Sequence, residues 1–470
     1  MAIDIIARGM IESSKNDISQ LFDITKGGEI VNNESSYTLN NAVDYPLLRL
    51  DLYGKSTQDG TPTPENPVDI VSVGDSGSVE VSACGKNLFD YTRLADTAYN
   101  GITFKNNNDG SFTVSGKKAD TSKHFSAYKD YTHAESINIL TAGKYTISSS
   151  LTPNSNLYGY VNLYYNGNSF YSVATTTENG KKTFAITEDM LGYDDFRFQI
   201  GFYSPPNKDV ITGTFNLQLE HGDTATDFEP YKGNIASITS SLPLCGIPVS
   251  EGGNYTDSNG QQWACDELIY NADGTGKIVK NIRKYTFTGA DEGGYWFLNS
   301  TVDTTKKRFQ FKFTDENIKP VYDSDKFTNK VQSRIFCDKY QALKNVDTYE
   351  CINGITVSHT AGYIAVYDEN YSTISTINDW IAYLAENPIT VVYQLNTPQE
   401  IELSAAEISA LKQLQTFNGV TNIFNDGGAD MTVKFCTNNM LSEYVLPITT
   451  GLQKQIDELK SAVLSLGGNV

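Results

Sequence analysis

The stretch Leu157–Val173, LYGYVNLYYNGNSFYSV, holds two runs of alternating residues on either side of Asn166-Gly167. In an extended chain Leu157, Val161 and Leu163 fall on one face, and the intervening tyrosines and asparagine fall on the other. Asn-Gly supplies the positive φ angles that a tight hairpin turn requires. The stretch therefore predicts a β-hairpin that is buried on one side only.

Similar hairpin signals are dense from Ala83 to Tyr231. GITFKNNNDGSFTVSG (101–116) holds two strand-like runs around Asn108-Asp109-Gly110, and GKYTISSSL, FRFQIGFYS and GTFNLQLE add further strands. About eight strands fall within about 145 residues, a number that is typical of a jelly-roll sandwich.

The composition favours the same class. The chain has 470 residues, long enough for about three domains, and its 29 Tyr and 37 Gly favour strands and turns over helices.

Its net charge of −20 would repel a phosphate backbone, so we expect no nucleic-acid partner. No apolar run approaches the roughly 20 residues that span a bilayer, and the N-terminus lacks the features of a secretory signal. We therefore expect no membrane partner and synthesis in a reducing cytoplasm. The six cysteines are scattered without metal spacing, which indicates free thiols.

We expect a mainly β chain of tandem β-sandwich or jelly-roll modules with a short N-terminal helix and a C-terminal coiled-coil helix. The expected parts are an N-terminal helix and anchor (1–35), a small β unit with a connector (36–82), a jelly-roll module (83–231), a hairpin-rich linker module (232–282), a second β-sandwich with two short helices (283–438), and a coiled-coil oligomerisation helix (439–470). One short helix is predicted by the capping box Ser404-x-x-Glu407.

The C-terminal stretch LQKQIDELKSAVLSL has the spacing of a coiled-coil seam. Its apolar positions repeat at intervals of four and three residues: Leu452, Ile456, Leu459, Val463 and Leu466. A lone helix of this length is marginal in water, so we expect it to pack against copies of itself. β-branched residues at the first heptad position favour two strands, but two heptads are too few to decide the number of copies.

Motifs for catalysis are absent. The sequence has no G-x-S-x-G, H-E-x-x-H, P-loop or G-x-G-x-x-G motif and only four histidines. The adjacent pairs Asp194-Asp195 and Asp266-Glu267 do not suit a glycosidase, because neighbouring carboxylates of a strand point to opposite faces and are expected in solvent. Asp257-x-Asn259-Gly260 lacks the distal glutamate of a calcium loop and predicts a polar turn. We expect no enzyme activity, no cofactor and no metal.

The polar faces of three strands are the candidate binding residues. They combine aromatic rings with planar polar groups, the combination that binds sugars. The candidates are Tyr158, Tyr160, Asn162, Tyr164, Arg197, Gln199, Tyr203, Asn216, Gln218 and Glu220. The alternative is that they form the ordinary solvated face of a one-sided antiparallel sheet.

Several stretches resemble one family. GTPTPENPVDIVSVG followed by CGKNLFD, NLQLEHGDTATDFEPY, NYTDSNGQQWACDEL, VVYQLNTPQEIELSAAE and NIFNDGGADMTVKF look like the mosaic minor structural proteins of tailed phages and prophages of Gram-positive hosts, over residues 1–440. The resemblance implies a tail-tip, baseplate or fibre protein that is usually trimeric, with jelly-roll modules that resemble carbohydrate-binding modules and touch the host wall. QLEHGDTATDFEPY then resembles the closing strand and exit turn of such a module, with a domain border near Tyr231.

The expected function is that of a virion structural protein of the tail fibre, baseplate or receptor-binding type, a homo-oligomer, by resemblance a homotrimer, located in the virion tail or baseplate. Its expected partners are copies of itself, other virion proteins at the N-terminal region, and a host cell-wall glycan. A polysaccharide-degrading tailspike, which needs two facing carboxylates, is one alternative. A head fibre or a purely architectural virion protein is the other.

Overall fold

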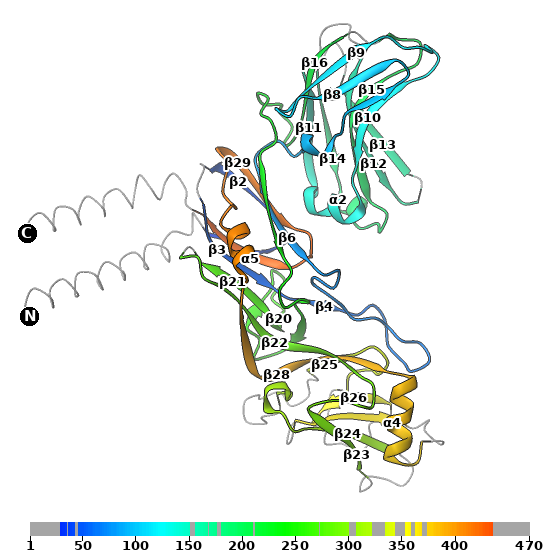
Figure 1. Ribbon diagram of the computed structural model, residues 1–470, viewed down its shortest axis with the longest axis vertical. Helices are drawn as coiled ribbons and strands as arrows, with labels where there is room; N and C mark the ends of the chain where they lie inside the picture. The colour runs from blue at the N-terminus through cyan, green and yellow to red at the C-terminus, as the bar shows by residue number, and fades with distance from the viewer. Residues whose placement is uncertain are drawn as a thin grey trace, which may run out of the picture.

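The computed structural model describes residues 29–34, 36–42, 46–150, 156–167, 169–175, 180–209, 212–271, 273–299, 307–321, 334–343, 353–358, 362–368 and 374–435. These residues are mainly β, as predicted, and several sheets follow one another along the long axis of the molecule (Figure 1). The expected N-terminal helix and the coiled-coil residues Leu452, Ile456, Leu459, Val463 and Leu466 lie outside the described residues. The expected boundary of the N-terminal helix and anchor (1–35) is too late in the sequence. Residues 29–34 form the strand β1 (Glu29–Glu34), which pairs with β30 (Asp430–Phe435).

The first group of strands, residues 84–231, is called the sandwich module here because two sheets share one core. The four-stranded sheet has the order β10 (Phe125–Asp130), β15 (Arg197–Ser204), β12 (Tyr158–Tyr165) and β13 (Ser169–Ala174). The six-stranded sheet has the order β14 (Lys181–Ile186), β11 (Gly143–Ser149), β16 (Gly213–His221), β9 (Ser111–Gly116), β8 (Ile102–Asn106) and β7 (Thr97–Tyr99). The described residues of the module also form the short helices η1 (Tyr91–Arg93), α2 (His133–Ile139) and α3 (Glu188–Leu191).

Alternating side chains fill the core between these two sheets. Phe202 of the four-stranded sheet meets Phe104 and Phe112 of the six-stranded sheet at ring-centroid distances of 5.6 and 5.3 Å. All three rings are buried, so the apolar half of each strand supplies the hydrophobic driving force for the module.

The two predicted hairpin turns are confirmed. Asn166 and Gly167 have φ angles of 54° and 74° and join β12 to β13, while Asn108 and Gly110 have φ angles of 60° and 87° and join β8 to β9. Positive φ is accessible to glycine and is tolerated by asparagine, so these residues fix the two hairpin turns.

The second group of strands, called the central module, is formed by residues 29–83, 232–282 and 396–435. Its largest sheet extends into residues 283–395. The strand order is β1, β30, β3 (Leu47–Tyr53), β21 (Glu267–Asn271), β22 (Gly276–Phe287), β28 (Ile389–Glu402) and β25 (Ile335–Cys337). A second sheet has the order β17 (Gly233–Ile238), β6 (Val79–Cys84), β29 (Gly419–Asn425) and β2 (Ser36–Ala42). Smaller sheets contain β18 (Gly246–Val249), β20 (Gln262–Cys265) and β19 (Tyr255–Thr256), and β4 (Ser56–Thr57) and β5 (Val71–Ser72).

This arrangement differs from the expected linear series of parts. Segments 36–82 and 232–282 and the end of 283–438 share one buried core, which includes Leu50, Leu268 and Met431. The physical reason is that each segment offers strand edges whose N–H and C=O groups are unpaired until a segment distant in sequence pairs with them. The chain therefore leaves the central module to build the sandwich module and then returns to it.

The third group of strands, called the distal module, is formed by residues 283–395. Its sheet has the order β23 (Gly294–Asn299), β24 (Lys307–Phe313), β27 (Ile364–Asp368) and β26 (Gly354–Val357), with η2 (Glu316–Ile318) nearby. Helix α4 (Ile377–Glu386) packs on it through Trp380, whose ring stacks on Phe309 at a centroid distance of 4.4 Å. The strands β22 and β28 are long enough to enter both the central and the distal modules (Figure 1).

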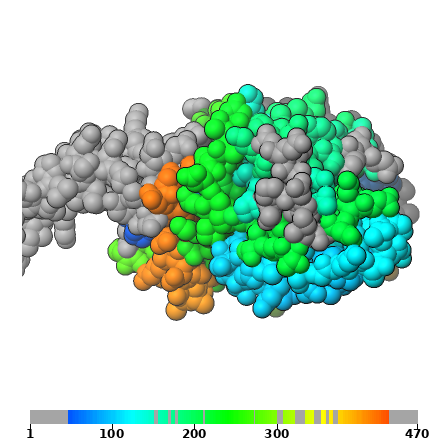
Figure 2. Space-filling view, turned by 90° about the horizontal axis from the view of Figure 1, so that it is seen from above, coloured from blue at the N-terminus to red at the C-terminus, as the bar shows by residue number. Residues whose placement is uncertain are grey.

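Helix α5 (Ala405–Leu411) lies in the central module and begins at the predicted capping box. The Ser404 side chain accepts from the Glu407 backbone N–H, and the Glu407 side chain accepts from the Ser404 backbone N–H. Seen from above, the sandwich module covers much of the visible face, and the orange C-terminal part of the central module lies beside it (Figure 2).

Candidate functional site

Seven of the ten candidate residues lie together on the outer side of the four-stranded sheet of the sandwich module. Strand β12 contributes Tyr158, Tyr160, Asn162 and Tyr164, and β15 contributes Arg197, Gln199 and Tyr203. The register places them side by side, with Tyr158 opposite Tyr203, Asn162 opposite Gln199, and Tyr164 opposite Arg197. We call this surface, with its neighbours on β10 and β13, the tyrosine–amide face.

A row of hydrogen bonds crosses all four strands of the tyrosine–amide face. The Ser172 hydroxyl donates to Asn162 Oδ1 at 2.8 Å, and Asn162 Nδ2 donates to Gln199 Oε1 at 3.0 Å. Gln199 Nε2 then donates to Asp130 Oδ1 at 2.7 Å. Because each amide is held by its neighbours, the planar polar groups are oriented before any ligand arrives.

Tyrosine rings flank this row of amides. The Tyr160 hydroxyl donates to Gln199 Oε1 at 2.9 Å, and burial raises the pKa of Tyr160, so this phenol stays protonated and remains a donor. Its ring meets that of Tyr203 edge to face at 6.4 Å, and His124 stacks on Tyr203 at 5.9 Å. Tyr128 on β10 is 44% exposed. Tyr160 itself is only 6% exposed, so the aromatic surface open to a ligand comes from the other tyrosines of the face, beside the hydrogen-bonding groups.

The tyrosine–amide face also carries a pair of opposite charges. The Arg197 guanidinium lies over the Tyr164 ring at 4.2 Å, and its Nη1 lies 3.8 Å from Asp130 Oδ1. Both side chains of this ion pair are about half exposed, so the pair contributes little to stability. It remains available to a ligand in solvent.

Three candidates, Asn216, Gln218 and Glu220, do not belong to this surface. They lie on β16, in the six-stranded sheet, and Gln218 and Glu220 are buried. Glu220 accepts from the backbone N–H and the hydroxyl of Thr226, and Gln218 Oε1 accepts from the backbone N–H of Glu229. Gln218 and Glu220 bind the exit segment of the module itself, so their assignment as exposed sugar-binding residues is wrong. Asn216 is partly exposed, but it lies in the other sheet, and its Oδ1 accepts from the backbone N–H of Ser150 at 3.0 Å.

Sequence reasoning missed Tyr128, Asp130 and Ser172. The signal for the first two was the alternation of FSAYKD (125–130), in which Phe125 and Ala127 are buried and the other side points outward. Ser172 follows the same rule on β13. The sequence did not show that β10 pairs with β15, because these strands are far apart along the chain.

The adjacent carboxylate pairs have structural roles. Asp195 accepts from the backbone N–H groups of Asn166 and Gly167 and so holds the β12–β13 turn. Asp266 is fully buried rather than solvated, with Lys280 Nζ 2.5 Å from its Oδ2.

The remaining sequence motif, Asp257-x-Asn259-Gly260, is the predicted polar turn. Asp257 Oδ1 accepts from the backbone N–H groups of Asn259 and Gln261, and its Oδ2 accepts from Trp263 Nε1 at 3.0 Å. In the described part of the chain, no group of three His, Cys, Asp or Glu residues is placed to hold a metal ion. None of the described helices is both long and apolar enough to cross a membrane.

Comparisons with known proteins do not place the chain in a family. No protein-family model and no curated protein matches the chain. A structure of accessory secretory proteins 1, 2 and 3 from Streptococcus pneumoniae is aligned over 30% of this chain and 96% of that one, at 8% identity and a TM-score of 0.19. The infectious bursal disease virus VP2 subviral particle is aligned over 92% of both chains, at 11% identity and a TM-score of 0.09. TM-scores this low support no argument about fold or function.

Proposed function

We propose that the chain is a structural and adhesive protein of a phage virion, in which tandem jelly-roll-type modules present the tyrosine–amide face to glycans of the host surface. The observation that carries the binding part is the row of hydrogen bonds from Ser172 to Asp130, flanked by tyrosine rings. The position in a virion tail or baseplate is supported by the resemblance of the quoted sequence stretches to phage minor structural proteins.

The chemistry of the face suits a sugar for two reasons. Aromatic rings cover the apolar side of a pyranose, and oriented amide and carboxylate groups bond to pairs of adjacent hydroxyls. In Asn162 and Gln199, one N–H of each side-chain amide is used within the row, and the second N–H is not required by it. A sugar can therefore bind without breaking the row.

A single such site on an open sheet is expected to be weak. The proposed homo-oligomer, assembled through Leu452, Ile456, Leu459, Val463 and Leu466, would place several copies on one particle. Binding of the first site then raises the effective concentration of the others, so that weak sites give slow dissociation from a surface that carries many glycans.

The test uses the assembled full chain and purified cell-wall polysaccharides of Gram-positive bacteria on a sensor surface. Replacing both amides, in Asn162→Ala with Gln199→Ala, should weaken retention about 10-fold or more, because two bonds to sugar hydroxyls are lost. Thr103→Ala with Ser115→Ala is the matched control on the outer side of the six-stranded sheet, where these two residues are opposite each other. It should leave retention unchanged.

Two outcomes would count against the proposal. One is equal retention of the amide variant and the control variant, which would exclude the tyrosine–amide face. The other is the absence of any retained polysaccharide. An assay for new reducing ends on the same samples distinguishes adhesion from depolymerisation, and labelling the protein in intact particles for electron microscopy tests its place in the virion.

A further inference from the structure

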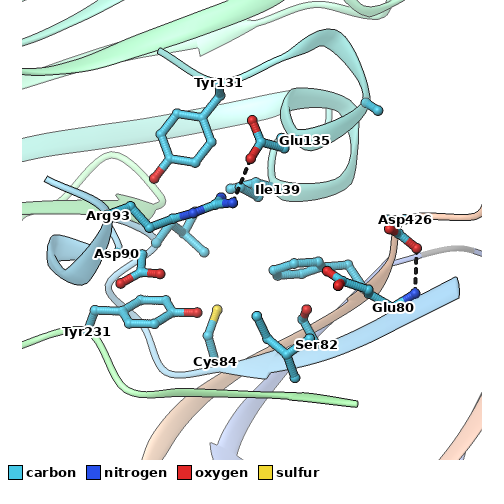
Figure 3. A pocket seen from close by; sticks show the side chains of 14 residues that line it. Glu80, Ser82, Cys84, Asp90, Arg93, Tyr131, Glu135, Ile139, Tyr231 and Asp426 are labelled. Carbon is cyan, nitrogen blue, oxygen red and sulfur yellow. Dashed lines mark hydrogen bonds and ion pairs between the residues drawn. The ribbon is translucent and has the colours of Figure 1, made fainter. Parts of the chain in front are cut away.

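A cavity of about 160 Å³ lies where the sandwich module meets the central module. It is lined from the sandwich side by η1, α2 and Tyr131, and from the central side by β6 and β29 (Figure 3). Cys84, Leu88 and Tyr131 are at most 3% exposed, whereas Arg93, Ala134 and Ile235 are exposed. The cavity therefore has a buried floor and a rim that solvent reaches.

The hydroxyl of Tyr131 is the unusual group on the floor. The Tyr131 ring is packed parallel to Phe198 at a centroid distance of 4.2 Å, and the residue is 1% exposed. Its hydroxyl is buried and makes no hydrogen bond of normal geometry within the described residues, with the Arg93 guanidinium as a close polar neighbour, although buried polar groups are normally paired. Figure 3 shows this hydroxyl pointing toward Arg93 and Asp90. A ligand hydroxyl at this place would supply the missing bond.

The other polar groups of the cavity are held in place by the protein. Arg93 Nη2 lies 2.6 Å from Glu135 Oε1, and Glu135 Oε2 accepts from the backbone N–H of Thr132 in the capping box of α2. Asp90 Oδ1 accepts from the backbone N–H and the hydroxyl of Thr92. Donor and acceptor groups thus stand at fixed positions around the floor.

The lining also limits the chemical class of the ligand. Four carboxylates, of Glu80, Asp90, Glu135 and Asp426, and one guanidinium, of Arg93, line the cavity, so an anion is repelled. The Arg93 guanidinium keeps a ligand cation away from the Tyr131 hydroxyl, whereas the carboxylates attract a cation elsewhere in the cavity, which the charged probe below tests. Leu88, Ile139 and Phe424 add apolar surface. A neutral ring with several hydroxyls and an apolar side matches this lining.

We propose that this cavity binds one neutral sugar residue, with a ligand hydroxyl paired to the Tyr131 hydroxyl. The site is separate from the tyrosine–amide face and does not depend on that face binding glycan. Because its walls come from both modules, an occupied cavity also joins the sandwich module to the central module.

The test is isothermal titration of the full chain with glucose, galactose, mannose and N-acetylglucosamine, with ethanolammonium and inorganic phosphate as charged probes. Tyr131→Phe removes only the unpaired hydroxyl and keeps the stacked ring, so it should fold normally and bind the sugar about 3- to 10-fold more weakly. Ala134→Phe narrows the rim and should reduce binding more than 10-fold. Tyr295→Phe, at an exposed tyrosine of the distal module, is the matched control and should bind like the parent chain.

The proposal is overturned if none of the four sugars binds, if only a charged probe binds, or if Tyr131→Phe and Ala134→Phe bind like the parent. Asn162→Ala with Gln199→Ala separates the two sites. Loss of monosaccharide binding in that variant alone would assign the sugar to the tyrosine–amide face and refute the cavity. If Asn162→Ala with Gln199→Ala still binds the monosaccharide and Tyr131→Phe binds it more weakly, the cavity is supported. This result does not depend on whether the tyrosine–amide face binds polysaccharide.

Discussion

Glu407 is expected to be one of the strongest single contributors to stability in the central module. Its buried carboxylate accepts five hydrogen bonds, from the backbone N–H of Thr239 and from the backbone N–H and hydroxyl groups of both Ser240 and Ser404, at 2.6 to 2.9 Å. The carboxylate therefore holds the start of α5 against the end of β17. In Glu407→Gln one carboxylate oxygen is replaced by an amide nitrogen, which cannot accept, so the N–H and hydroxyl groups that donated to that oxygen lose their partner.

The size of the effect follows from the pKa of Glu407. Burial alone would raise this pKa, but the hydrogen bonds from Ser240, Ser404 and Thr239 outweigh burial and lower it from 4.5 to about 2. At about 1.4 kcal/mol for each pKa unit, the ionised carboxylate contributes about 3 kcal/mol. Because the folded-state pKa is the lower one, this stability is fully present above about pH 5 and is lost as the pH falls toward 2.

Hydrogen exchange of the segments 233–242 and 403–414 measures this contribution locally, which suits a chain of several modules. At pH 7 Glu407→Gln should expose these segments about 100-fold more often than the parent, and the difference should shrink at pH 3. Glu400→Gln is the control, because the Glu400 side chain forms an exposed ion pair with Lys277. Equal exchange rates in the two variants at pH 7 would refute the reasoning. So would a faster exchange in Glu407→Gln than in the parent that is the same at pH 7 and pH 3.

Two further predictions concern buried groups of the central module and its border. Lys280→Met should lower the local free energy of unfolding by about 3–5 kcal/mol, since it leaves the buried Asp266 carboxylate without its cation. Lys277→Met should cost less than about 1 kcal/mol, and hydrogen exchange of β21 and β22 in both variants measures the difference. Burial raises the pKa of the Cys84 thiol to about 12, so iodoacetamide at pH 8 should spare it until urea is added, and peptide mapping that finds native Cys84 labelled would contradict the packing. The same protection is expected for the other buried thiols: Cys245, Cys265 and Cys337.

The local features of this protein could be predicted because their causes lie within a few residues of one another. The Asn166-Gly167 turn, the Ser404–Glu407 capping box and the polar turn at Asp257 depend on backbone angles and on bonds between near neighbours. The alternation in β12 and β15 likewise determined which side chains share a face, because strand geometry has a period of two.

The tertiary structure alone decided which strands became neighbours and what covers each polar face. Backbone N–H and C=O groups are the same at every residue, so a strand edge can pair with any suitable partner, and the sequence does not reveal that 29–84 pairs with 233–238 and 419–435. In the sequence, alternating polar residues give the same pattern whether water or another segment of the chain covers them in the folded protein. That is why Asn162 and Gln199 form an open face, while Gln218 and Glu220, in an equally regular pattern, are buried beneath their own exit segment.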